Sequence, residues 1–265
     1  MNKLDKLFSE KSNNILSIYF TAGFPALNDT GLIISELIRN GVDLIEIGMP
    51  FSDPLADGPT IQESSQVALE NGMSIEFLFR QLEGLISTNV PLILMGYLNP
   101  VLQYGIERFC EDASTLGISG VIIPDLPLQE YLNEYKILFD KYDLKNIFLI
   151  TPQTSDERIR LIDEHSNGFI YMVSSAATTG AKTGITEQQE NYFKRVRSME
   201  LKNPVLAGFG ISDRQSFSKV CEYATGGIIG SAFIKSLSGG GAISEKTKLF
   251  VKSVKPINEV LDKNN

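Results

Sequence analysis

Two acidic residues, Glu46 and Asp57, have a type and a spacing that suit acid–base chemistry. Glu46 lies in the apolar run 44–48, which is typical of a buried strand. A carboxylate inside such a strand costs free energy unless it has a partner or a function. Asp57 lies in the following loop, 50–59, whose prolines fix the backbone and cannot start a helix there. We expect this stiff loop to hold Asp53 or Asp57 above the end of the strand.

A simpler interpretation gives the loop aspartates a purely structural role. Asp53 and Asp57 precede a helix that we expect at 60–70, and short acidic side chains often cap a helix by accepting from its first N–H groups. This alternative is weaker for Glu46, which lies within the apolar run. The residues alone leave both interpretations open for the loop.

Glycine-rich segments mark a second candidate region, at 207–212 (AGFGIS) and 227–232 (GIIGSA). Glycines allow backbone N–H groups to approach an anion, and Ser231 adds a hydroxyl donor at the expected start of a helix. The alternative is that these glycines only form turns. Their position after the last two expected strands favours a phosphate site, because barrels often bind phosphate there.

Short apolar segments alternate with amphipathic segments along the whole chain. The expected strands are 14–21, 44–48, 91–97, 120–123, 145–150, 168–174, 204–207 and 227–230. The expected helices are 5–10, 31–39, 61–70, 74–85, 105–116, 128–142, 154–164, 187–199, 212–223 and 244–261, with another starting at Ser231.

Eight such strand–helix units predict an α/β fold, a (β/α)8 TIM barrel. We expect one domain over residues 1–265, preceded by a short N-terminal helix, since the composition shows no break or linker. An open doubly wound sheet is the alternative, but the G-x-G-x-x-G fingerprint is absent after the first strand. In a barrel, the loops after the strands gather the chemistry on one face.

Composition excludes several classes of function. A net charge of −8 argues against nucleic-acid binding, which needs a basic surface. No apolar run approaches the length of a membrane span, and the charged start of the chain does not resemble a signal peptide. Cys110 and Cys221 lie far apart in sequence and are expected to be reduced, so we expect a cytoplasmic protein.

The available side chains limit the chemistry further. His165 is the only histidine and lies in a polar segment at an expected helix end, so neither a histidine metal site nor a Ser-His-Asp triad is expected. The sixth strand does not end in a lysine, which argues against a Schiff-base aldolase. Proton transfer by carboxylates, with no metal and no cofactor, is the chemistry that remains.

The loop resembles the signature segment of the tryptophan synthase alpha chain family. That pattern, E-[LIV]-G-x-P-[FY]-S-D-P-x-A-D-G-P, is matched at every fixed position of 46–59. The segments GFGIS at 208–212 and GSA at 230–232 are similar to those that hold the substrate phosphate in this family. The resemblance implies that Glu46 and Asp57 are the catalytic pair, and that Gly210, Gly230 and Ser231 contact the phosphate.

The resemblance also implies a lid at 174–184, rich in small residues. Gly180 would contribute to the phosphate site, and Thr179 matches a threonine that contacts the catalytic aspartate when the lid closes. The chain departs from the family pattern at Ala177, where a glycine is usual. Tyr19, Phe20, Leu98, Tyr171 and Phe209 are expected to pack against a flat ring, and Tyr171 stands at the place of a family tyrosine.

By resemblance, the reaction is the retro-aldol cleavage of indole-3-glycerol phosphate to indole and glyceraldehyde 3-phosphate. The expected partner is a tryptophan synthase beta chain in an α2β2 complex, facing the segments 50–53 and 99–100. Pyridoxal phosphate would belong to that partner, and indole would pass to it for tryptophan synthesis.

Three alternatives remain at this point. The chain could be a free-standing indole-releasing lyase, an inactive barrel that only activates a partner, or another phosphate-binding barrel enzyme such as an isomerase. The intact pair Glu46 and Asp57 argues against an inactive barrel, and the S-D-P-x-A-D-G-P loop has no place in the isomerases.

Overall fold

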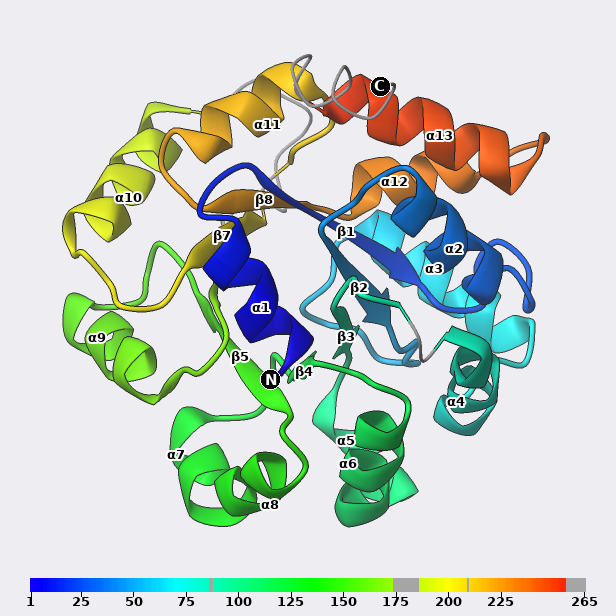
Figure 1. Cartoon of the computed structure of the whole chain (residues 1–265), viewed down its shortest axis with the longest axis horizontal. Helices are drawn as coiled ribbons and strands as arrows, with labels where there is room; N and C mark the ends of the chain where they lie inside the picture. The colour runs from blue at the N-terminus through cyan, green and yellow to red at the C-terminus, as the bar shows by residue number, and fades with distance from the viewer. Residues whose placement is uncertain (86–87, 174–185, 209, 256–265) are drawn as a thin grey trace.

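The computed structural model describes residues 1–85, 88–173, 186–208 and 210–255. Parallel strands form a closed barrel in which each strand pairs with the next and β8 pairs with β1, and helices surround it (Figure 1). The strands are β1 (Ile15–Thr21), β2 (Leu44–Gly48), β3 (Leu92–Met95), β4 (Gly120–Ile122), β5 (Lys145–Ile150), β6 (Ile170–Val173), β7 (Val205–Gly208) and β8 (Gly226–Ile229). The expected (β/α)8 barrel is confirmed.

The helices between the strands form the outer layer, and α1 lies across one end of the barrel (Figure 1). They are α1 (Lys3–Glu10), α2 (Thr30–Arg39), α3 (Pro59–Glu70), α4 (Ile75–Leu82), α5 (Leu98–Tyr104), α6 (Ile106–Thr115), α7 (Leu128–Glu130), α8 (Lys136–Lys141), α9 (Asp156–His165), α10 (Glu187–Ser198), α11 (Arg214–Cys221), α12 (Ser231–Leu237) and α13 (Ile243–Val254). A 3₁₀ turn, η1 (Glu83–Leu85), follows α4, and a π-helical turn, η2 (Tyr131–Tyr135), joins α7 to α8. Within the described ranges, no helix is both long and apolar enough to cross a bilayer.

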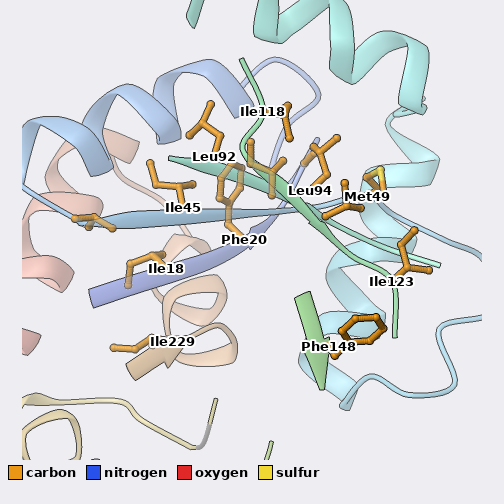
Figure 2. Close-up of a cluster of buried hydrophobic side chains, with 14 of the residues drawn as sticks. Ile18, Phe20, Ile45, Met49, Leu92, Leu94, Ile118, Ile123, Phe148 and Ile229 are labelled. Carbon is orange, nitrogen blue, oxygen red and sulfur yellow. The ribbon is translucent and has the colours of Figure 1, made fainter. Parts of the chain in front are cut away.

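Apolar side chains on the two faces of the strands build two separate layers. The outer layer, between strands and helices, includes Ile18, Phe20 and Ile45 (Figure 2). The inner layer fills the interior of the barrel near the starts of the strands. It consists of Ile15, Leu44, Ile93, Ile122, Ile147, Phe169, Leu206 and Ile228, together with Leu4 of α1. Both faces of each strand are therefore buried, which explains the nearly continuous apolar strands of the sequence.

Helix α1 closes the end of the barrel at which the strands begin, called the lower end below. Leu4 is fully buried in the inner layer. The Asn2 side-chain amide donates to the backbone oxygens of Ser119 (3.0 Å) and Asp143 (2.7 Å), and its oxygen accepts from Leu4 N. These bonds tie α1 to the starts of β4 and β5, so it acts as a plug for the inner layer.

Several predicted boundaries are wrong. The third strand ends at Met95, and residues 98–104 form α5, which the sequence did not predict. Ser212 does not cap α11; Asp213 does, accepting from Ser216 N at 2.8 Å. The last helix is described to Val254, and the remainder of the expected 244–261 segment lies largely outside the described residues.

We predict that Leu4→Ala destabilises the barrel by about 2–5 kcal/mol, because it leaves a cavity in the inner layer. Leu249→Ala on α13 is the matched control, since Leu249 is 58% exposed and should cost about 0.5 kcal/mol or less. Equilibrium urea denaturation of both variants measures the difference. Equal losses in the two variants would mean that α1 does not seal the core.

Candidate active site

Glu46 points into the barrel from β2, opposite Tyr19 in the register between β1 and β2. Its side chain is fully buried. Ser17 Oγ donates a 2.6 Å hydrogen bond to Glu46 Oε1, whereas Oε2 has no hydrogen-bond partner within the described parts of the chain. The carboxyl group is therefore held on one side only.

Burial raises the pKa of Glu46 to about 7, and the hydrogen bond from Ser17 opposes the rise. Removal from water disfavours the charged form of a carboxyl group, and here no cation compensates among its described contacts. A carboxyl group with a pKa near neutrality can both give and take a proton under physiological conditions.

Two inward-facing tyrosines surround this carboxyl group. A Cβ atom at Gly48 would lie 2.2 Å from the Tyr19 hydroxyl oxygen, and one at Gly208 would lie 2.3 Å from that of Tyr171. Glycine is therefore required at both positions for the rings to fit. The pKa of each tyrosine is raised by burial first, and also by the charges of Glu46 and Asp57. The structure thus brings the two carboxylates and two tyrosines together.

Asp57 lies half-buried above β2 and is held by a tyrosine that the sequence did not single out. The Tyr97 hydroxyl donates to Asp57 Oδ2 at 3.1 Å and accepts from Ala56 N at 3.0 Å. The Phe51 ring lies 5.1 Å from the Tyr97 ring. Burial raises the pKa of Asp57, and the Tyr97 hydrogen bond lowers it.

The capping interpretation of the loop is wrong. Gly58 occupies the N-cap position of α3, and no side chain caps that helix. The Asp53 carboxylate instead accepts from its neighbour Ser52. Asp57 is thus free of a capping role and faces the mouth of the barrel.

Asp57 lines a small cavity at that mouth. The cavity is lined by Tyr19, Met49, Phe51, Pro54, Asp57, Ser65, Met95, Gly96, Tyr97 and Pro124. Glu46 lies on β2, three residues before Met49 and deeper in the barrel. Asp57 and Tyr19 both line this cavity, so the loop carboxylate and a barrel tyrosine meet there.

The glycine segments meet the same region from the other side. Gly230 is the N-cap of α12, which starts at Ser231 as expected, and a Cβ at Gly230 would lie 3.2 Å from the Tyr19 ring. Gly210 has a positive φ of 21°, and a Cβ atom added there would meet no described atom within 4 Å. Ala177, Thr179, Gly180 and Phe209 lie outside the described residues.

Two predicted ring contacts need correction. Phe20 points outward into the layer beneath the helices, because it follows Tyr19 on a strand whose side chains alternate between faces. Leu98 starts α5 and packs against that same outer layer.

Ser17 and Tyr97 were not predicted as site residues from the sequence. Ser17 had a detectable signal: it is a polar residue in an apolar strand, two positions before Tyr19 and therefore on the same face. Tyr97 had none, because its role depends on how the loop folds back. In the described part of the chain, acidic, histidine and cysteine side chains form no group that could hold a metal ion.

A closed parallel barrel that carries its polar side chains at the carboxyl ends of the strands belongs to the class of TIM-barrel enzymes. The model of one family, described as tryptophan synthase alpha chain, matches residues 5–260. The chain belongs to the tryptophan synthase alpha chain family.

Relatives and solved structures agree over nearly the full length. The tryptophan synthase alpha chain of Flavobacterium johnsoniae is 59% identical over 248 residues, 92% of this chain and 98% of the relative. That of Parabacteroides distasonis is 50% identical over 96% of this chain and all of the relative. The crystal structure of the Legionella pneumophila alpha chain superposes with a TM-score of 0.86 at 30% identity, covering 100% of this chain and 99% of that one. A tryptophan synthase structure from M. tuberculosis gives 0.83 at 28%, covering 96% and 98%.

The raised pKa of Glu46 predicts a pH-dependent cost in stability. The folded chain binds this proton more tightly than the unfolded chain, whose carboxyl titrates near 4.5, so stability is lost as pH rises from there through about 7. Glu46→Gln removes this loss. We expect the variant to gain about 3 kcal/mol relative to the parent between about pH 4 and pH 8. Urea denaturation of both proteins at each pH measures this gain, and a pH-independent difference would contradict the burial of a titrating Glu46.

Tyr97→Phe should raise the pKa of Asp57, because the carboxylate loses a donor that stabilises its charged form. NMR titration of ¹³C-labelled aspartate measures the shift, with Asp57→Asn assigning the resonance. Tyr104→Phe is the matched control, since Tyr104 donates a 2.6 Å hydrogen bond to Asp112 elsewhere in the barrel. A shift of Asp57 in the control, or none in Tyr97→Phe, would contradict the assignment.

Proposed function

We propose that Glu46 and Asp57 carry out the reversible cleavage of indole-3-glycerol phosphate to indole and glyceraldehyde 3-phosphate. Alpha chains of this family are lyases that act on that substrate, and the family model matches residues 5–260 of this chain. The observation that carries the proposal is the fully buried carboxyl group of Glu46, with a pKa of about 7 and one oxygen that has no hydrogen-bond partner among the described residues. The charges of Glu46 and Asp57 both act on Tyr19.

Cleavage of the carbon–carbon bond requires two proton transfers. The protonated Glu46 gives its proton to C3 of the indole ring, which makes the ring an electron acceptor. The resulting carboxylate then takes the proton from the glycerol hydroxyl next to the breaking bond. That hydroxyl becomes the aldehyde, and the bonding electrons return to the ring to form indole. Asp57 accepts a hydrogen bond from the indole N–H and stabilises the positive charge that develops there.

The remaining site residues would bind the substrate. Backbone N–H groups at Gly210 and Gly230 and the Ser231 hydroxyl suit the phosphate, with Gly180 added by family resemblance. Tyr19, Tyr171 and Phe209 suit the flat ring. Thr179 would contact Asp57 when the lid closes. Both described tyrosines stay neutral, since burial raises the pKa of each.

We assign a beta chain as partner, in an α2β2 complex, with pyridoxal phosphate on that chain and none on this one. Similarity to tryptophan synthase structures from M. tuberculosis supports an assembly of this kind. The loop that carries Asp57 presents Leu55, 91% exposed, beside the segment 50–53, and 99–100 lies within α5 at the same end. A large exposed apolar side chain next to the site suits a protein contact. The proposed location is the cytoplasm.

Glu46→Gln should lower the rate of indole release at least about a hundredfold, because the amide cannot carry the proton. Asp57→Asn should also lower it, because the charge facing the indole nitrogen is lost. Indole release from indole-3-glycerol phosphate is measured with and without a beta chain. Glu36→Gln is the matched control, as Glu36 is a buried glutamate paired with Arg39 on the outer layer.

The same assay separates the alternatives. Activity that rises steeply when a beta chain is added supports the complex, whereas full activity alone indicates a free-standing lyase. Absence of indole under both conditions indicates an inactive activating subunit. Near-parent activity of Glu46→Gln would remove Glu46 from the mechanism.

A further inference from the structure

We propose that Ser17 is a positioning residue that holds Glu46 Oε1 and thereby leaves Oε2 as the oxygen that transfers the proton. This inference rests on the proposed function of Glu46 and names the atom through which it acts. Its basis is the asymmetric environment of the two carboxyl oxygens.

The hydrogen bond reaches Glu46 from below. In the register of β1 and β2, Ser17 pairs with Leu44, whereas Glu46 pairs with Tyr19. Ser17 therefore lies one inward layer nearer the plugged end of the barrel than Glu46. Both side chains are fully buried, and the 2.6 Å bond is short for a hydroxyl donor. Oε1 is thus directed away from the mouth at which substrate enters.

Glu46 Oε2 is buried and has no hydrogen-bond partner among the described residues. A buried acceptor without a hydrogen bond costs free energy, so this arrangement requires compensation elsewhere or a use. Substrate atoms that bear protons, the glycerol hydroxyl and the ring carbon, can use it. Because Ser17 occupies Oε1, one oxygen serves for both proton transfers, in agreement with a single shuttling carboxyl group.

A serine hydroxyl suits this position because it carries no charge. Glu36, another buried glutamate, is instead held by the charged guanidinium of Arg39 at 2.7 Å. A neutral hydroxyl fixes orientation while the carboxyl remains able to bind a proton, and it can stay bonded to Oε1 in both protonation states. Ser17 thus fixes the orientation of the Glu46 carboxyl group without placing a charge beside it.

The titration of Glu46 can be distinguished from that of the other ionisable groups that face it. Tyr19 on β1 and Tyr171 on β6 have raised pKa values and stay neutral at physiological pH. Asp57 lies in the loop above, and the pKa shift of Glu46 has burial and the Ser17 hydrogen bond as its causes. The neighbouring β3 contributes Ile93 and Met95, which carry no charge. A change near neutral pH in a Ser17 variant that disappears when Glu46 is also replaced by Gln is therefore a change in Glu46.

Ser17→Ala tests the assignment in the full chain with its beta chain. We expect the pKa of Glu46 to rise by about one unit and kcat for indole release to fall about tenfold, with KM changed less than about twofold. The pKa is measured by NMR of ¹³C-labelled glutamate, assigned with Glu46→Gln, and independently from the pH profile of kcat. Ser17→Thr keeps a hydroxyl on the same Cβ and should restore both values.

Ser166→Ala is the control for loss of a buried serine hydroxyl, because Ser166 is buried and donates a 2.7 Å hydrogen bond to Ile162 O on α9. It should leave the pKa and kcat unchanged. An unchanged Glu46 titration in Ser17→Ala, or equal losses in the alanine and threonine variants, would overturn the positioning role. Failure of the proposed function is seen separately, as an active Glu46→Gln.

Discussion

The burial of one carboxyl group inside the barrel is the constraint on which the rest of the site depends. Glu46 is removed from water, receives one neutral hydrogen bond from Ser17 and has no described cationic partner. An ionised group in such a place is unstable, so the carboxyl group titrates near neutral pH instead of near 4.5. A strong ion pair would have made the barrel more tolerant of the charge, but it would also have removed the ability to exchange a proton.

Side chains fill the two halves of the barrel to different extents, which leaves room for the Glu46 carboxyl group. Below Glu46 and Ser17, large apolar side chains and helix α1 close the barrel. Above it, glycines at 48 and 208 make room for the tyrosine rings that form the walls. Small and large residues thus alternate between neighbouring strands at one level, and the site occupies space that a uniformly packed barrel would fill.

Sequence could predict the barrel, the inward Glu46 and the acidic loop, because strand periodicity and a long contiguous motif are both local properties of the chain. It could not predict that Tyr97 holds Asp57, since that contact joins residues 40 positions apart through the folded loop. It also misplaced Phe20, although alternation from Tyr19 puts the two on opposite faces. The capping role considered for the loop failed because Gly58, and not an aspartate, stands at the N-cap.

The two carboxylates differ in how the chain controls them. Glu46 is held by a rigid strand and a fixed floor, which suits a group that must reach two atoms of one substrate. Asp57 is held by a loop through a tyrosine that also accepts from Ala56 N, so its position depends on the loop conformation. The same loop exposes Leu55 to any partner at the barrel mouth. A contact that moves this loop would displace Asp57 while leaving Glu46 in place, so under the proposed mechanism a partner at the barrel mouth would act on the stabilisation of the ring nitrogen before it acted on the proton shuttle.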